Sequence, residues 1–303
     1  MNQEVCSILE TLGFDAEAFG ELKKAEECAG TSDEWNALIQ IPLVQVPEND
    51  WKALQEQISE IALRCGLAPQ VLHLLYLSLQ LPAMEAAYRD RGIPEEFFWD
   101  TAGDLRCKLA ECRERFGVSG TASFLWQIPF FFLRMFTLGR LTYEKRVFPG
   151  PEHTCGGVTV REGDVVLGLH IPSGAPFDRE SRMDSYRKAF DFYGHTKDKP
   201  LIVHGSSWLL SPDHEKELPA TSNIVDFIHD FDMLGSVDKT GFPDAWRIYG
   251  SAASEPMENW PRKTALQKLY YKLMSTGQKA KGGFGILVFD GEKLLTGRGR
   301  TEE

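Results

Sequence analysis

The stretch "DVVLGLHIP", residues 164 to 172, predicts a buried strand, because apolar side chains fill almost all of it. "SGAP", residues 173 to 176, then predicts a turn, and "DRESRMDSYRKAFDFYG", residues 178 to 194, predicts a helix. A second apolar strand follows in "PLIVHGSSWLL", residues 200 to 210. This order of strand, helix and strand predicts a sheet with helices packed on its faces.

The alternation continues on both sides of this segment. "RLTYEKRVF", residues 140 to 148, predicts a strand, and "HTCGGVTVREG", residues 153 to 163, predicts a third strand or one arm of a hairpin. Four further elements are expected after the central segment: a helix in "SNIVDFIHDF" (222–231), a strand in "AWRIYGS" (245–251), a helix in "TALQKLYYKLMSTG" (264–277) and a final strand in "GFGILVFDGEKLL" (283–295), with Gly282 and Gly283 in the turn before it.

Residues 1 to about 118 carry a different pattern, in which apolar residues recur at helical spacing. In "NDWKALQEQISEIALRCG", residues 49 to 66, Trp51, Leu54 and Ile58 keep this spacing. The sequence therefore predicts the α+β class, with a helical N-terminal domain over 1–118 and a mixed sheet flanked by helices over 119–303.

The most apolar run, "ASFLWQIPFFFLRMF" at residues 122 to 136, is expected to be buried in protein rather than in a bilayer. It is shorter than the roughly 18–20 apolar residues of a membrane-spanning helix, and it contains Gln127, Pro129 and Arg134. The first residues, "MNQEVCSILETLGF", lack the charged and apolar regions of a signal peptide. We therefore expect a cytoplasmic protein with no membrane partner.

The charge and the cysteines exclude several classes of function. The 303 residues carry a formal net charge of −11, whereas a nucleic-acid-binding protein needs a basic surface. The six cysteines form no CxxC motif, so reduced thiols are expected rather than a zinc site or a disulfide framework. His214 and His229 have acidic neighbours, but these clusters are interpreted as solvated polar edges, and no metal site is predicted.

Two familiar catalytic motifs are incomplete in this chain. A hydrolase nucleophile elbow needs GxSxG, but Trp208 stands where Ser206 would require the second glycine. "GQKAKGGF", residues 277 to 284, has glycines at suitable spacing for a phosphate loop but lacks the following Lys-Ser/Thr. A serine triad can still assemble in space, so a hydrolase built on Ser206 or Ser207 stays open as a distant alternative.

The segment "HIPSGAPFDRES", residues 170 to 181, has the features of an anion site. A strand that ends at a glycine turn and leads into a helix brings free N–H groups and the positive end of the helix dipole together. Arg179 and Arg182 add positive charge to this helix. A plain connecting loop with solvated charges is the alternative.

Five phrases of the C-terminal part together resemble a known family. "FTLGRLTYE", "LHIPSG", "DSYRKAFDFY", "GSSWLLSP" and "SNIVDFIHDF" follow one another in the order seen in bacterial acyltransferase-domain proteins. These proteins pair a helical N-acyltransferase N-terminal domain with a GNAT-like C-terminal domain. The resemblance covers the chain from about residue 120 to the end and is weaker over the helical first part.

The resemblance implies an enzyme that moves an acyl group from an acyl-coenzyme A co-substrate to a small-molecule amine, with no covalently bound cofactor. Acyl-coenzyme A would lie between two splayed central strands, and the amine would attack the thioester directly while a base takes its proton. His170 and His204 are the candidate bases, with Glu144 as a further candidate, and Ser206, Ser207 or Tyr193 would donate to the leaving thiolate. Binding of coenzyme A is expected from Ile171, Ser173, Gly174, Arg179, Arg182, Ser207, Trp208 and Asn223, although helix capping is favoured for Asn223 and its neighbour Ser222.

One departure from the family keeps a second interpretation open. The usual Arg/Gln-x-x-Gly-x-Gly/Ala loop is replaced by "PSGAPFDRES", with the single glycine Gly174 and with Pro176, which has no N–H. A non-catalytic protein that binds a small molecule or an acyl ligand on a GNAT-like scaffold is therefore the alternative. The sequence names neither the acceptor, the acyl length nor the oligomeric state.

Overall fold

The computed structural model describes residues 1–297, which form two compact units that meet between Thr137 and Leu138. The expected boundary after residue 118 lies earlier than this point. The reason is the helix α9 (Phe124–Phe131), whose Phe124 ring lies 5.0 Å from the ring of His73 and 6.0 Å from that of Tyr76. These aromatic contacts join the apolar run to the helical core.

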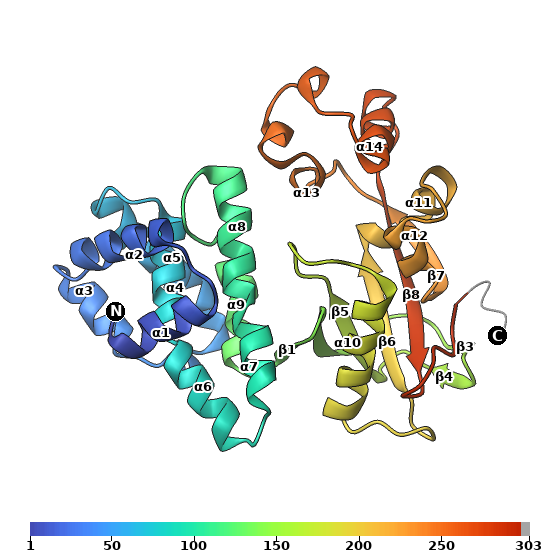
Figure 1. The fold of residues 1–303 in the computed structure, drawn as a ribbon, viewed down its shortest axis with the longest axis horizontal. Helices are drawn as coiled ribbons and strands as arrows, with labels where there is room; N and C mark the ends of the chain where they lie inside the picture. Colours follow the sequence, from blue (N-terminus) through green and yellow to red (C-terminus); the bar gives the residue numbers. More distant parts are fainter. Residues whose placement is uncertain (298–303) are drawn as a thin grey trace. The chain divides into compact units, whose positions relative to one another are not determined.

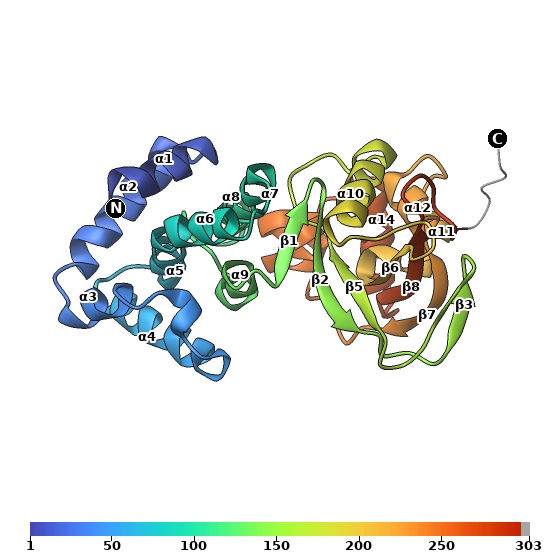
Figure 2. The same cartoon turned by 90° about the horizontal axis from the view of Figure 1, so that it is seen from below.

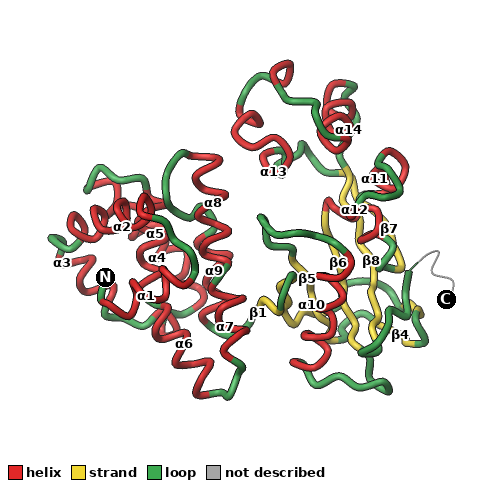
Figure 3. Tube along the Cα trace, in the orientation of Figure 1, coloured by secondary structure: helices red, strands yellow, loops and turns green. Residues whose placement is uncertain are grey.

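The first unit is built from helices (Figures 1 and 3). At its centre α5 is buried without interruption from Val71 to Ser78, because its sequence is apolar all round. His73 within it is a core residue, and its Nε2 lies 3.0 Å from the Ser59 hydroxyl. The helices are α1 (Gln3–Thr11), α2 (Ala16–Ala29), α3 (Asp33–Ile39), α4 (Trp51–Arg64), α5 (Pro69–Leu79), α6 (Leu81–Asp90), α7 (Glu95–Ala102), α8 (Asp104–Phe116) and α9, with short 3-10 turns η1 (Leu43–Gln45) and η2 (Glu48–Asp50).

The second unit contains a mixed sheet, which confirms the predicted α+β class. Within the described residues, its strands β2, β5, β6, β8 and β7 lie in that order, and the short strand β1, which ends at Leu138, is the sixth strand beside β2. The strands β3 and β4 form a separate hairpin (Figure 2). The pair β5–β6 is parallel, whereas β2–β5, β6–β8 and β7–β8 are antiparallel. The strands are β1 (Met135–Leu138), β2 (Leu141–Val147), β3 (His153–Cys155), β4 (Val158–Val160), β5 (Val165–His170), β6 (Leu201–Ser207), β7 (Asp232–Asp238) and β8 (Lys281–Phe289).

The two faces of this sheet are covered differently. The helix α10 (Arg179–Phe192) packs on one face, where its Tyr186 ring lies 6.1 Å from that of Phe289 and its Ser185 bonds to Tyr143. The hairpin β3–β4 covers part of the other face. The buried cluster there consists of Phe148, Val160, Val166, Ile286 and Val288. The remaining elements are η3 (Trp208–Leu210), α11 (Pro212–Glu217), α12 (Asn223–Ile228), α13 (Trp246–Tyr249), η4 (Gly250–Ser254), η5 (Met257–Asn259) and α14 (Ala265–Ser275).

Two predicted elements are corrected by the structure. Residues 245–251, expected to be a strand, form α13 and the start of η4, and Tyr249 packs there against Trp260 at 4.4 Å between ring centroids. The neighbouring edge strand is β7, whose polar residues, Gly235 and bulged register hid it from the sequence pattern. Gly282 and Gly283 lie within β8 rather than in a turn before it.

Candidate active site

The central strands β5 and β6 diverge at their C-terminal ends. Their parallel ladder contains only the pairs Leu167–Val203 and Gly168–His204, although β5 continues to His170 and β6 continues to Ser207. The strands on the outer sides of β5 and β6 stay paired to the end: Thr142 of β2 lies opposite His170, and Gly283 of β8 lies opposite Ser207. Within residues 1–297, the ladder between β5 and β6 thus stops short of both strand ends, which leaves room between them for another molecule.

A hydrogen-bonded histidine–glutamate pair lies beside this splay, on the face of the sheet that also carries the hairpin. His170 Nε2 is 3.0 Å from Glu144 Oε1, and the two residues come from the neighbouring strands β5 and β2. The bond from His170, followed by the effect of Arg146, lowers the pKa of the Glu144 carboxyl below its usual value despite partial burial. Two residues that the sequence proposed separately as bases are thus brought together as one unit.

His204 lies in the same row of this face, opposite Gly168 on β5. Its ring is buried, it meets the Phe148 ring edge-on at 5.4 Å between centroids, and its Nδ1 has no hydrogen-bond partner among residues 1–297. Burial, helped by the nearby positive charge of Arg146, lowers the pKa of His204 to about 4. The imidazole is therefore neutral near pH 7 and is a much weaker base than an ordinary histidine.

The loop between β5 and α10 is organised by one arginine. The Arg140 guanidinium donates to the carbonyl oxygens of Pro172 at 2.8 Å, Ala175 at 3.3 Å and Pro176 at 2.6 Å, and it lies 5.2 Å from the Phe177 ring centroid. With the Pro176 carbonyl on Arg140, the Phe177 N–H of the same peptide unit is directed away from the guanidinium. The N–H groups of Gly174, Ala175 and Phe177 donate no hydrogen bond to any residue in the described part of the chain.

Side chains and the helix end add positive potential at this loop. Gly174 has a φ of +83° and open space around it, so the backbone is accessible there. Asp178 caps α10, and its carboxylate accepts from the Ser181 N–H at 2.8 Å. Arg247, from α13, reaches Ser173 with an N–H···O distance of 3.2 Å. Sequence reasoning missed Arg247, because its segment was interpreted as a strand.

Arg182 occupies a different position from its neighbour Arg179. Its guanidinium is fully buried, where it donates to Asp230 at 2.9 Å and to Asp226, and the Tyr186 hydroxyl also donates to Asp230 at 2.9 Å. These bonds fix α10 to the segment around α12, so Arg182 supports the loop from inside. The Arg179 side chain is half exposed at the start of α10.

The other predicted site residues divide between the splay and the surrounding structure. Ser206 is exposed at the end of β6, and Ile171 begins the loop after β5. Ser207 caps η3 by accepting from the Leu209 N–H at 3.1 Å. Trp208 packs in an aromatic cluster with His214, Phe242 and Tyr270. Ser222, not Asn223, caps α12, and Asn223 is the exposed first residue of that helix.

Tyr193 is not brought to this site. It follows the last residue of α10, about 20 Å along the helix axis from the loop at its start. The Lys145 Nζ lies 5.9 Å from its ring centroid, and Lys145 points to the face of β2 opposite to Glu144, because side chains alternate along a strand. The position of Tyr193 does not fit a donor to the leaving thiolate.

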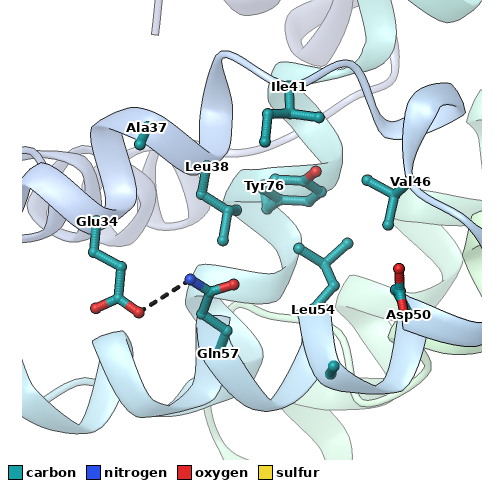
Figure 4. Close-up of a pocket in the computed structure, with 10 residues that line it drawn as sticks. Glu34, Ala37, Leu38, Ile41, Val46, Asp50, Leu54, Gln57 and Tyr76 are labelled. Carbon is teal, nitrogen blue, oxygen red and sulfur yellow. Dashed lines mark hydrogen bonds between the residues drawn. The ribbon is translucent and has the colours of Figure 1, made fainter.

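The helical unit contains a cavity of its own, of about 320 Å³ (Figure 4). Its walls are mainly apolar, and Glu34 and Asp50 lie at its edge, where the Gln57 amide donates to Glu34 at 3.1 Å. The Tyr76 ring forms part of the lining, and burial raises the pKa of its hydroxyl to about 12. The cavity contains none of the residues predicted for acyl transfer. Of residues 1–297, no helix is both long and apolar enough to cross a bilayer.

Solved structures with a similar fold are acyltransferases. An acyltransferase mutant in complex with octanoyl-CoA has a TM-score of 0.76 at 20% identity, with 95% of this chain and 88% of that chain covered. An acyltransferase with decanoyl-CoA (TM-score 0.62, 22% identity, 93% and 98% covered) and one with decanoyl-CoA and teicoplanin (0.64, 19%, 94% and 99%) also match. No curated protein sequence matches the chain.

Family models account for almost the whole length of the chain. Residues 3–133 match the N-acyltransferase N-terminal domain, and residues 135–287 match the GNAT-like C-terminal domain. The junction between the two matches lies close to the division of the compact units at Thr137. The chain therefore belongs to the family of the GNAT-like C-terminal domain, carried here behind an N-acyltransferase N-terminal domain.

Proposed function

We propose that this protein is an N-acyltransferase that moves an acyl group from an acyl-coenzyme A thioester to the amine of a small-molecule acceptor. The observation that carries the proposal is the splay of β5 and β6, which lies between a loop of free N–H groups and the Glu144–His170 pair. The similar acyltransferases hold octanoyl-CoA or decanoyl-CoA, and one of them also holds teicoplanin, which supports a medium-length acyl donor and a small-molecule acceptor.

The loop after β5 is proposed to bind the pyrophosphate of coenzyme A. The N–H groups of Gly174, Ala175 and Phe177 donate to no residue among 1–297, and the N-terminus of the 14-residue helix α10 adds its dipole. Arg179 and Arg247 supply positive charge beside them. Arg140 binds the carbonyls of Pro172, Ala175 and Pro176 and thereby holds the loop in one conformation, which we propose compensates for the absence of further glycines.

His170 is proposed as the general base, and Glu144 as the residue that orients it. When the His170 Nε2–H donates to Glu144, the lone pair of the neutral ring is on Nδ1. The amine nitrogen forms a bond to the thioester carbon, Nδ1 takes the proton that the nitrogen loses, and the carbon–sulfur bond breaks to release the coenzyme A thiolate. The Glu144 carboxylate stabilises the imidazolium that forms, and proton transfer to the thiolate completes the reaction.

The base assignment is tested by steady-state kinetics with an acyl-coenzyme A and a panel of amines. We expect His170→Ala to lower kcat/KM by about 10²- to 10⁴-fold, the usual contribution of a positioned base. Glu144→Gln should cause a smaller loss and change the pH profile, since the amide cannot stabilise an imidazolium. His195→Ala is the control, because that histidine bonds to the Lys199 carbonyl away from the splay. Unchanged turnover in His170→Ala would exclude His170 as the base.

The two alternative functions have separate tests. A non-catalytic binding protein would be stabilised by acyl-coenzyme A but would acylate none of the amines. A serine hydrolase would be labelled by a fluorophosphonate probe at Ser206 or Ser207, and the label would be lost in the corresponding alanine variant. The bond from the Leu209 N–H to the Ser207 hydroxyl favours a capping role for that serine.

A further inference from the structure

Three metal-binding side chains converge outside the proposed active site. His153 and Cys155 come from β3 and Asp232 comes from the start of β7, and one donor atom of each lies within 4.8 Å of the other two. His153 Nε2 is 2.8 Å from Asp232 Oδ2 across a sequence separation of 79 residues. Figure 2 shows the hairpin β3–β4 beside the β7 side of the sheet.

The local backbone explains why these donors meet. His153 and Cys155 are two positions apart on one strand, so their side chains point to the same side of it, while Thr154 between them points away and bonds to Thr159 at 2.9 Å. Cys155 packs against the core cluster under the hairpin. Asp232 pairs with Ile286 of β8, whose side chain belongs to that same cluster, so the carboxylate rises from the sheet toward the hairpin.

We propose that His153, Cys155 and Asp232 form a zinc-binding site that fastens the hairpin β3–β4 to the edge strand β7. A nitrogen, a sulfur and an oxygen donor are the set that Zn²⁺ accepts, whereas Mg²⁺ and Ca²⁺ require oxygen donors. Tetrahedral zinc bonds of 2.0–2.3 Å separate the donors by about 3.3–3.6 Å. The donor atoms of the three side chains lie within 4.8 Å of one another, so displacements of up to about 1.5 Å separate them from that spacing. His153 and Asp232 are about one-third exposed, which leaves solvent access for water as the fourth ligand.

The position of the site assigns it a structural rather than a catalytic role. Glu144, Gly168, His204, Ile286 and Asp232 form one row across five neighbouring strands. At about 4.8 Å between strands, Asp232 lies roughly 19 Å along the sheet from Glu144. The metal would therefore not reach the thioester, and it would stabilise the hairpin independently of acyl transfer.

Metal binding by the full-length, untagged protein tests the proposal. We expect one equivalent of Zn²⁺ to bind in competition with a chromophoric chelator, and Co²⁺ to give the near-ultraviolet charge-transfer absorption of a thiolate–cobalt bond. Cys155→Ser should abolish this absorption and weaken Zn²⁺ binding by about 100-fold or more, because even residues that only orient ligands cost 10- to 100-fold. Cys6→Ser, at a half-buried cysteine of α1, is the matched control and should leave both unchanged.

Two further measurements keep the test decisive if Cys155→Ser folds poorly. His153→Gln keeps a hydrogen-bonding side chain beside Asp232 but removes the imidazole ligand. This variant should also fail to bind one equivalent of Zn²⁺ tightly. Hydrogen exchange of residues 153–160 should slow when Zn²⁺ is added to the unmodified protein. A folded protein that shows no thiolate–cobalt absorption, or one whose absorption survives Cys155→Ser, would overturn the proposal. The hairpin would then be held by its apolar core cluster and by the His153–Asp232 hydrogen bond.

Discussion

At the scale of single residues, His204 links stability to pH. Its pKa is lowered to about 4 in the folded chain from the ordinary 6.5, because burial opposes the charged ring. As the pH falls, His204 therefore binds a proton in the unfolded chain before it does so in the folded chain. The free energy of unfolding is unaffected by this difference above pH 6.5 and decreases as the pH falls from 6.5 toward 4. The gap corresponds to on the order of 3 kcal/mol.

We expect the difference in unfolding free energy between the unmodified protein and His204→Gln to change over this pH range. Urea unfolding at several pH values between 4 and 7 measures it, with His229→Gln, at a partly exposed histidine, as the control. The unmodified protein should lose stability relative to His204→Gln as the medium is acidified. A difference that stays constant between pH 7 and 4 would mean that His204 keeps its ordinary pKa in the folded state.

The buried guanidinium of Arg182 gives a second prediction at this scale. It is paired with the carboxylates of Asp226 and Asp230, so its removal takes away the cation that faces the buried charge of Asp230. We expect Arg182→Met to lower the unfolding free energy by about 3–5 kcal/mol. Arg187→Met, at an exposed position of the same helix, should change it by less than about 0.5 kcal/mol. Equal stability of the two variants would contradict the structural role.

The sequence predicted candidate residues for the site, but it did not predict which of these residues contact one another. Glu144 and His170 were selected because each lies near the end of a predicted strand. Their bond depends on the antiparallel register that places Thr142 opposite His170, and one sequence does not encode that register locally. Arg179 and Arg182 also looked equivalent on the helix. Arg182 follows Arg179 by three residues on α10 and therefore lies on a different side of the helix, which faces inward. There it binds Asp226 and Asp230, which are 44 and 48 residues away in the chain.

At the scale of elements, the loop between β5 and α10 depends on Arg140. Its donors bind three loop carbonyls and its plane lies near Phe177, so its loss would let the peptide units turn. We expect Arg140→Gln to raise the Kd for coenzyme A by about tenfold or more, since hydrogen bonds to charged groups contribute about 1.5–3 kcal/mol each. Isothermal titration calorimetry measures this, with Arg187→Gln as the control. An unchanged Kd would remove the loop from the coenzyme A site.

Glycine is required within the strand β8 at a point where another segment packs closely against its backbone. A Cβ on Gly283 would lie 1.8 Å from the Leu210 carbonyl oxygen, so only glycine lets η3 approach this strand. We expect Gly283→Ala to lower the unfolding free energy by about 1–3 kcal/mol through backbone displacement. Gly157→Ala is a poor control because of its positive φ, whereas Gly20→Ala, in open space within α2, should be neutral or stabilising. Chemical unfolding distinguishes the two, and a neutral Gly283→Ala would contradict the close approach.

The elements that the sequence predicted well are those with a strong apolar period. The strands β2, β5 and β6 and the helix α10 lie within their predicted ranges, because each buries a regular set of side chains, whereas β8 begins two residues before its predicted range. The edge strand β7 was missed because no residue of "DMLGSVD" is fully buried, three of the seven are exposed, and its register is broken by a bulge. "AWRIYGS" has the composition of a strand, but packing of Tyr249 against Trp260 favours a helical turn instead. Tertiary contacts outweigh local preference in both cases.

At the scale of the whole molecule, the chain consists of two compact units with different expected responses to ligand. The splay, the loop and the Glu144–His170 pair all belong to the second unit, which begins at Leu138. A ligand that binds only the folded state stabilises it by about 2.7 kcal/mol at a hundredfold excess over Kd. For a unit of this size, that energy raises the Tm by roughly 5–10 °C.

We therefore expect acyl-coenzyme A to protect the second unit selectively. Hydrogen exchange resolved by peptide should slow in β5, β6 and the loop over 171–178, while the amides of α5, at the centre of the helical unit, should keep their rates. Arg140→Gln, measured at the same ligand concentration, should show weaker protection because less of it is bound. If α5 slowed as much as β5 did, the stabilisation would be shared by both units, and if neither slowed at millimolar acyl-coenzyme A, the proposed donor site would be wrong.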